Sequence, residues 1–470
     1  MAKVGLFGIG LDTYWSQFDG LLENLFSYQE TIKSKIAGYG IEVVDAGMVD
    51  NPEKARIAAD LLKKNDVELV FLYVSTYALS STVLPVAQKL NVPVIILNMQ
   101  PAASLDYKSF NELGDRGRMT GAWLENCQAC SVPEIASVFN RSGIQFDIIT
   151  GYLADNESWI EIEAWVEAVR VLNAVRSNRL GILGHYYGGM LDVYTDITKI
   201  SAVFGTHIEI LEMCELKKYR DETTDVELKD KIDEFNDSFD VANECDEYEL
   251  ERAALTSVAM DKLVGKHNLG SVAYYYEGEA GNEYENIVTS VIAGNTILTG
   301  KNIPIAGECE VKNAIAMKIM AEFGSGGSFS EFYLMDFNDD VVMLGHDGPA
   351  HFAIAEGRVK LVPLPIYHGK PGKGLSIQMT VKHGPVTLLS VVEGKDEVFL
   401  LIAEGESVEG PVMEIGNTNS RYRFSIGVRE FMNNWSKQGP AHHCAIGVGH
   451  IASKIEKLGA LLNVSVKKVC

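Results

Sequence analysis

The chain has 470 residues, which is enough for about three domains of ordinary size. Asp and Glu number 64 against 41 Lys and Arg, and the resulting net charge of −23 argues against an extended nucleic-acid-binding surface. Hydrophobic residues make up 47% of the chain, which excludes disorder along its whole length. We therefore expect a folded protein whose partners do not include nucleic acid.

The first ten residues, MAKVGLFGIG, contain a short apolar run broken by glycines and lack the continuous apolar core of a signal peptide. No stretch approaches the roughly 18 uninterrupted apolar residues that a membrane span needs. The seven cysteines are few and odd in number, which favours reduced thiols over a disulfide framework. These features predict a cytoplasmic protein with no membrane role.

The first domain is predicted to cover residues 1–178. Apolar, β-branched runs alternate here with helical patterns, as is typical of a parallel sheet that is covered on both faces. We expect a doubly wound α/β domain. Its predicted strands are residues 4–9, 41–45, 68–74 and 92–97, and its first two predicted helices are residues 18–39 and 52–65.

A second set of alternating strands and helices follows over residues 179–328, so we predict a second Rossmann-like α/β domain. Strands are expected at residues 179–185, 207–211 and 271–276, and helices near residues 192–204 and 284–298. The acidic stretch 215–251 carries apolar residues at helical spacing, which predicts solvated helix rather than an interaction tail.

The pattern changes in the third predicted domain, residues 329–470. Short β-type runs are separated there by Gly, Pro and Asp, which indicates an antiparallel barrel or sandwich followed by a helix at residues 451–462. We expect a mainly antiparallel, barrel-like domain. The predicted strands are residues 341–344, 359–364, 375–380, 386–392 and 398–402.

Several acidic and histidine side chains lie at positions suited to chemistry. Glu308 stands between a strand-like run and a helical run, where side chains commonly face a cleft. Glu331 shares a predicted strand face with aromatic residues, and His346 ends an apolar run. His442 and His443 are adjacent and are expected in a turn, where one can bind a metal while the other contacts substrate. Their wide separation defines no local motif.

In the order Gly307-Glu308, Gly326-Gly327-Ser328-Phe329-x-Glu331, Gly345-His346 and Ala441-His442-His443, these segments resemble the L-arabinose isomerase family. The resemblance extends over the whole chain, including Met190, the segment 192–196 and the segment Tyr275-Tyr276-Glu277. It implies two α/β domains and a barrel-like domain. It also implies a homohexamer or homotetramer with active sites at subunit interfaces.

The resemblance further implies a divalent metal, usually Mn²⁺ and otherwise Co²⁺ or Mg²⁺, held by Glu308, Glu331, His346 and His443. Two carboxylates and two imidazoles suit such an ion and leave positions open for two sugar oxygens. Interconverting an aldose and a ketose moves a proton between C1 and C2, and Glu308 and Glu331 are the predicted acid/base pair. His442 is predicted to contact a substrate hydroxyl or to assist ring opening. The leading substrate is L-arabinose.

The N-terminal half departs from the family where a neighbouring subunit would contact the sugar. Asp12, Tyr14 and Trp15 stand at the positions where arabinose isomerases carry Gln, Leu and Tyr after the first strand. Cys130 stands where the family has a histidine. We predict these four residues, together with Met190 and Tyr276, as substrate contacts. Because one added or missing hydrogen bond can change discrimination greatly, the preferred sugar is expected to differ more readily than the reaction.

The sequence also allows other interpretations. Cys127-x-x-Cys130 is either a redox or zinc half-motif or a pair of small packed residues. The chain is either an isomerase or a sugar-binding or regulatory protein that has lost catalysis, and the same ligands also fit a metal hydrolase with a metal-bound water. Within the isomerase reading, a hydride shift competes with proton transfer.

Overall fold

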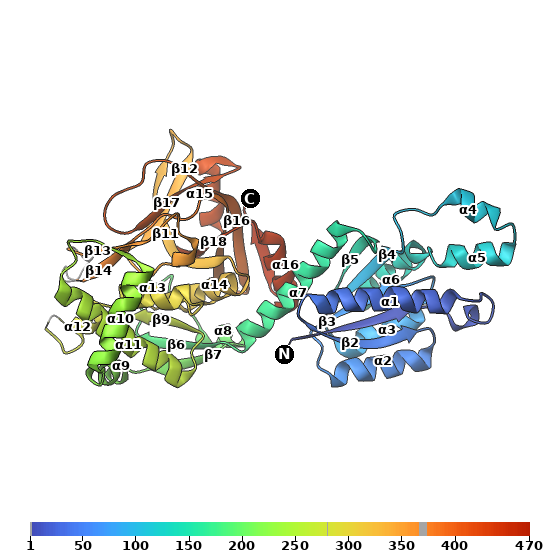
Figure 1. Cartoon of the computed structure of the whole chain (residues 1–470), viewed down its shortest axis with the longest axis horizontal. Coiled ribbons are helices and arrows are strands. Elements are labelled where there is room, and N and C mark those ends of the chain that lie inside the picture. The colour runs from blue at the N-terminus through green and yellow to red at the C-terminus, as the bar shows by residue number, and fades with distance from the viewer. Residues whose placement is uncertain (1, 280, 366–373) are drawn as a thin grey trace. The chain divides into compact units, whose positions relative to one another are not determined.

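The computed structural model describes residues 2–279, 281–365 and 374–470 (Figure 1). Contacts divide the chain into two compact units, Met1–Asn173 and Ala174–Cys470. None of the described helices is long and apolar enough to cross a membrane. The predicted boundary near residue 178 lies close to this division, and the one at residue 328 falls inside a strand; the three-domain division stays a prediction.

The first unit contains a parallel sheet with the strand order β2-β1-β3-β4-β5. Its central strand β3 is buried along its whole length, as expected for apolar β-branched residues in a sheet that helices cover. The strands are β1 (Lys3–Ile9), β2 (Glu42–Val49), β3 (Leu69–Val74), β4 (Val94–Gln100) and β5 (Phe146–Tyr152). The helices are α1 (Leu21–Gly38), α2 (Pro52–Lys64), α3 (Ser80–Leu90), α4 (Tyr107–Glu112), α5 (Arg116–Leu124), α6 (Gln128–Ser142) and α7 (Asn156–Arg176).

The second unit begins with a smaller parallel sheet in the order β10-β9-β6-β7. Both parallel sheets confirm the predicted α/β class. The strands are β6 (Arg179–Gly184), β7 (His207–Leu211), β9 (Ser271–Tyr275) and β10 (Ile305–Ala306). The helices are α8 (Ile197–Phe204), α9 (Met213–Asp221), α10 (Asp225–Ser238), α11 (Glu247–His267), α12 (Glu285–Val288), α13 (Ile292–Gly300) and α14 (Val311–Glu322).

The acidic stretch forms α9, α10 and the start of α11, as predicted. The predicted extents of two other helices were partly wrong. Residues 192–196 precede α8 as turn and loop, because Asp196 caps that helix through the backbone N–H groups of Thr198 and Lys199. The helix predicted at residues 284–298 is divided into α12 and α13, with residues 289–291 between them.

Helix α10 begins with a capping box, in which the Glu227 carboxylate accepts a hydrogen bond from the Thr224 backbone N–H at 2.8 Å. This bond and one from Lys262 lower the pKa of Glu227 to about 2 from 4.5. A lowered pKa stabilises the fold above the unfolded-state pKa, and this contribution is lost as the pH falls. We expect the melting-temperature difference between the native chain and Glu227→Gln to shrink between pH 4.5 and pH 2. A difference that grows on acidification contradicts this assignment.

The C-terminal part is a closed antiparallel barrel with the ring order β15-β18-β11-β12-β17-β16, closed by pairing of β16 with β15. The predicted barrel is confirmed. The strands are β11 (Gly326–Asp336), β12 (Val341–His346), β15 (Gly384–Glu393), β16 (Val398–Val408), β17 (Thr418–Phe424) and β18 (His443–Val448), with β19 (Ser465–Lys468) added in parallel to β16. Helices α15 (Gly427–Lys437) and α16 (Ala452–Leu462) follow β17 and β18.

Some strands predicted in the third domain lie outside the barrel. Strands β13 (Lys360–Pro363) and β14 (Leu375–Gln378) pair with each other and with the short β8 (Asp240–Val241) in a separate sheet. Helix α14 contacts β9 and β10 on one side and β11, β15 and β18 on the other (Figure 1). Its residues Val311–Ala321 are all buried for this reason. This helix joins the parallel sheet to the barrel inside one compact unit.

Candidate metal and sugar site

Glu308 lies in a single turn between β10 and α14, where the chain leaves the parallel sheet for the central helix. Both Glu308 and Cys309 adopt left-handed backbone angles, with φ of 54° and 58°. Such angles cost non-glycine residues about 1–3 kcal/mol each and concentrate at functional sites. Only 16% of the Glu308 side chain is exposed. The turn therefore holds this carboxylate in a fixed, strained position.

Strand register brings three other predicted residues together. Glu331 on β11 is paired with Gly345 on β12 and with His443 on β18. His346 follows Gly345 at the end of β12, and its backbone N–H donates to the Thr418 hydroxyl at 2.9 Å. A side chain at Gly345 would collide with a neighbouring backbone carbonyl, so glycine permits this close approach. Adjacent barrel strands thus present Glu331, His346 and His443 at one end of the barrel.

The Glu308 carboxylate lies among three imidazoles. Its Oε2 is 3.4 Å from Nε2 of His442 and 3.5 Å from Nε2 of His443, and its Oε1 is 4.0 Å from Nε2 of His346. Nε2 of His442 is also 3.9 Å from Oε2 of Glu331. The structure therefore brings together all five residues that the sequence singled out in the C-terminal half.

Two buried atoms at the centre of this cluster, Oε2 of Glu308 and Nε2 of His443, have no hydrogen-bond partner among the described residues. Such atoms are costly to bury unless something binds them. Two overlapping groups have ligand atoms within 4.8 Å of one another: Glu308, His346 and His443, and Glu331, His442 and His443. The donor set and its unpaired atoms fit a divalent cation.

A second carboxylate, Glu310, fixes the orientation of His443. Oε2 of Glu310 lies 2.6 Å from Nδ1 of His443, and both side chains are almost fully buried. Burial raises the pKa of Glu310 and lowers the pKa of His443. With Nδ1–H donated to Glu310, Nε2 of His443 presents its lone pair toward Glu308, as a metal-binding histidine requires.

His442 is held by Asp192, which precedes α8. One Asp192 oxygen accepts from the His442 backbone N–H at 3.0 Å and lies 2.6 Å from Nδ1 of the ring. Burial lowers the pKa of His442, but Glu308 and Asp192 outweigh it and raise the pKa to about 9. The buried Lys312 ammonium donates to the carbonyls of Asp192 and Tyr194 and anchors this loop. His442 therefore carries a positive charge at neutral pH.

Burial also acts to raise the pKa of Glu308, but His442, His443 and His346 lower it overall, so this carboxylate is ionised at neutral pH. The site combines an anionic carboxylate, a cationic imidazole and a neutral imidazole within a few ångströms. Such an arrangement can bind a cation and can also give or take protons.

The cluster opens into a cavity of about 340 Å³ in the second unit. Four of its lining residues are tyrosines, and none of its described lining residues is Lys or Arg. Met190, Tyr276 and His442 are not among the lining residues, and their roles as sugar contacts stay predictions. The residues that line it and bear on its chemistry are Tyr187, Tyr275, Glu308, Glu331, Tyr333 and His346.

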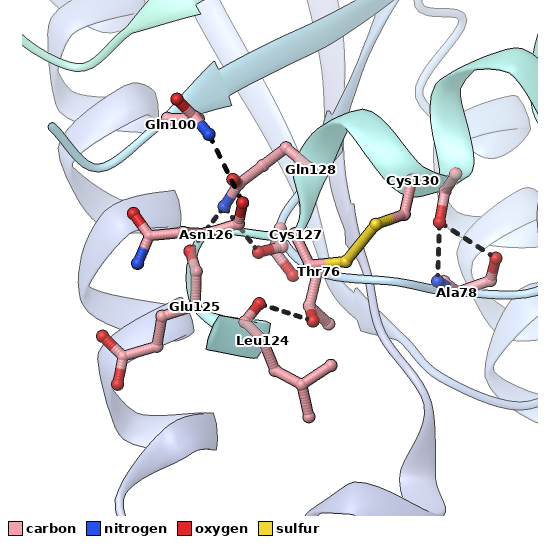
Figure 2. The surroundings of a disulfide bond; sticks show 11 residues. Thr76, Ala78, Gln100, Leu124, Glu125, Asn126, Cys127, Gln128 and Cys130 are labelled. Carbon is pink, nitrogen blue, oxygen red and sulfur yellow. Dashed lines mark hydrogen bonds between the residues drawn. A yellow bond between two sulfur atoms is a disulfide. The ribbon is translucent and has the colours of Figure 1, made fainter. Parts of the chain in front are cut away.

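The other predicted sugar contacts belong to the first unit. Asp12 and Tyr14 bound a short turn after β1, and the Trp15 indole N–H donates to Asp50 at 2.8 Å. Cys130 forms a disulfide with Cys127 (Figure 2). The expectation of reduced thiols was therefore wrong for these two residues, because the first turn of α6 brings their sulfur atoms together. The roles of these four residues in sugar binding stay predictions.

Comparisons with known proteins identify sugar isomerases that are similar to this chain. Residues 326–465 match the family model of the L-arabinose isomerase C-terminal domain. The predicted resemblance to L-arabinose isomerases is confirmed. The chain is 23% identical over 349 residues to an L-arabinose isomerase of a Nocardioides species, covering 70% of this chain and 68% of that protein. It is 20% identical over 297 residues to a sulfoquinovose isomerase of Alkalicoccus urumqiensis, covering 63% and 66%.

The chain thus spans about two thirds of the length of these curated relatives, and it is similar to sugar isomerases of the arabinose and sulfoquinovose type. Relative to this arabinose-isomerase-like pattern, sequence reasoning missed Glu310 and gave Asp192 no role. The Glu-x-Glu spacing of Glu308 and Glu310 was the available signal for the first. The sequence prediction also placed His443 in a turn, whereas only His442 lies in a bend and His443 begins β18.

Proposed function

We propose that the chain is a metal-dependent aldose–ketose isomerase that converts L-arabinose, or a related aldose, into the corresponding ketose. The observation that carries this proposal is the cluster of two carboxylates and three imidazoles at the end of a barrel of the arabinose-isomerase type. Its cavity of about 340 Å³ suits a monosaccharide. The wider setting that we propose is a cytoplasmic homohexamer or homotetramer.

Glu308, Glu331, His346 and His443 would hold the cation. Mixed carboxylate and imidazole donors without a nearby thiolate ligand favour Mn²⁺, with Co²⁺ or Mg²⁺ as alternatives. When bound, the divalent cation supplies positive charge that stabilises negative charge developing on the sugar oxygens. Nε2 of His443, which has no hydrogen-bond partner among the described residues, and Oε2 of Glu308, which faces the imidazoles, are the atoms that support this assignment most directly.

Glu308 and Glu331 would carry the proton transfer. One carboxylate takes the proton from C2 of the aldose and, as the carboxylic acid so formed, returns a proton to C1. The other moves the hydroxyl proton from O2 to O1, so that the ketose forms through an enediol. His442, cationic and fixed by Asp192, donates a hydrogen bond to a sugar hydroxyl. Solvent deuterium appears at C1 under this scheme, whereas a hydride shift carries the original hydrogen across.

The charge of the cavity favours an uncharged sugar. Because its described lining includes Glu308, Glu331 and Asp347 but neither Lys nor Arg, it offers no ammonium or guanidinium group to a sulfonate or a phosphate. Tyrosine hydroxyls and Asn417 instead provide hydrogen bonds to neutral hydroxyl groups. We therefore place a free aldose before a sulfonated sugar among the candidate substrates.

The deciding experiment measures ketose formation by metal-stripped protein, with and without added Mn²⁺. The panel is L-arabinose, D-galactose, L-fucose, D-arabinose and L-ribose, with sulfoquinovose as the anionic test. We expect turnover of a neutral aldose that depends on the metal and is lost again when a chelator removes it. Metal-dependent turnover of sulfoquinovose alone contradicts the neutral-sugar assignment.

A sugar-binding or regulatory protein that has lost catalysis is the alternative, because Asp12 and Cys130 depart from the family at predicted sugar contacts. Calorimetry with the same panel separates the two. Sugar binding by a folded, Mn²⁺-loaded protein that converts none of these sugars favours the alternative over the isomerase.

A further inference from the structure

The disulfide joins Cys127, the N-cap residue of α6, to Cys130 in the first turn of that helix (Figure 2). The two residues differ in their surroundings: Cys127 is 2% exposed, whereas Cys130 is exposed to solvent. A thiol in solution can therefore approach the bond from the side of Cys130. The other five cysteines are free.

Hydrogen bonds that do not involve sulfur hold the start of α6 in place. The buried Gln128 amide donates to the carbonyl of Ser75 at 3.0 Å, and the buried Ser131 hydroxyl accepts from the N–H of Ala78 at 2.8 Å. Both contacts tie the helix to the loop after β3. They remain available when the disulfide is open, so the two thiols stay within reach of each other. Opening and closing the bond requires no unfolding of the helix.

The place of Cys127 in the helix also favours exchange. As the N-cap of the 15-residue α6, it lies next to backbone N–H groups that have no partner within the helix. These groups and the helix dipole stabilise a thiolate at this position. When a thiol attacks Cys130, the Cys127 thiolate is therefore a good leaving group.

Cys127 also packs with residues that carry the predicted sugar contacts. It belongs to a small hydrophobic cluster in the first unit, against which the rings of Tyr14 and Trp15 pack. A change in the bonding of Cys127 therefore acts on the packing beneath both rings. The buried members of this cluster are Leu21, Leu25, Met48, Leu124 and Cys127.

We propose that Cys127 and Cys130 form a reversible thiol–disulfide site that exchanges with small-molecule thiols and disulfides and changes the affinity for sugar. The Cys130 thiolate attacks a sulfur of oxidised glutathione and releases one glutathione thiolate. The Cys127 thiolate then attacks Sγ of Cys130, which forms the protein disulfide and releases the second glutathione. The two thiol protons pass to the two released glutathione molecules, so one disulfide is reduced as one forms. The link to sugar affinity rests on the proposed function, whereas the exchange itself does not.

The exchange is tested on the full chain equilibrated over a series of ratios of reduced to oxidised glutathione. The samples are quenched in acid, unfolded and treated with an alkylating agent. Mass spectrometry then gives the number of alkylated cysteines in each chain. We expect two forms, with five and seven alkylated cysteines, that interconvert with one midpoint. Cys214→Ser removes an exposed free thiol of the second unit and should leave that midpoint unchanged. A chain that stays in one form at every ratio overturns the proposal.

The effect on sugar binding is measured on the same two forms. We expect KM to differ several-fold between them while kcat is unchanged, and we expect Cys127→Ser to lose this dependence on glutathione. Interconversion with the same KM in both forms overturns the link to sugar affinity. Interconversion in a protein that turns over no sugar counts against the proposed function and leaves the exchange standing, and calorimetry of sugar binding to both forms then decides the link.

Discussion

Replacement of Glu308 or Glu331 with glutamine is expected to lower kcat by about 10²- to 10⁴-fold. Glutamine keeps the size of the side chain but neither accepts nor returns a proton. The measurement is ketose formation from the best sugar of the panel at saturating Mn²⁺. Glu397→Gln is the control, because this carboxylate, just before β16, pairs with Lys467 on β19 at 2.9 Å, is about half exposed, and is no part of the cavity wall.

Metal binding has to be measured on the same variants, because both carboxylates are also proposed ligands. A variant that binds Mn²⁺ nearly as well as the native chain and still loses turnover identifies a proton-transfer role. Loss of both together identifies a ligand role only. Near-normal kcat in Glu308→Gln removes Glu308 from the chemistry, and the same result in Glu331→Gln removes Glu331.

The fold class could be predicted because the two kinds of sheet leave different patterns in the sequence. Buried parallel strands such as β3 are apolar without interruption and alternate with helical patterns, whereas the β-type runs of the barrel region are separated by turn residues. The prediction was least accurate at the ends of helices. Residues 192–196 carry no strong helix breaker, yet Asp196 bonds the first turn of α8 and excludes them from it.

The candidate site could be predicted only in part, because it depends on strand register. Nothing local connects Glu331 with His443, which become neighbours only when β11 pairs with β18. The family resemblance supplied the four proposed ligands for that reason. Glu310 was missed because its significance is its contact with His443, and a buried acid in an apolar helix start is recognised only when its partner is known. The Cys127–Cys130 bond is local, but sequence spacing alone favoured a pair of small packed residues over a redox pair.

His443 is the proposed ligand whose loss can be tested without any assay of turnover. Removing an outer partner of a ligating histidine typically weakens metal binding by about 10- to 100-fold. We expect His443→Ala, which removes the ligand itself, to weaken Mn²⁺ binding by more than about 100-fold, and Glu310→Ala to fall within the smaller range. Isothermal titration calorimetry with Mn²⁺ measures both, and His207→Ala, an exposed histidine on β7, should bind as the native chain does.

The loss of the ligand should weaken Mn²⁺ binding more than the loss of its outer partner. His443 is fully buried, so its replacement with alanine leaves a cavity and deprives the buried Glu310 of its partner. His443→Gln keeps more of the volume and separates loss of the ligand from loss of the fold, and the melting temperature of each variant shows which has occurred. If Mn²⁺ binds equally well to folded His443→Gln and to the native chain, His443 is no ligand. If Glu310→Ala weakens binding as strongly as His443→Gln, Glu310 acts on the metal directly rather than through the imidazole.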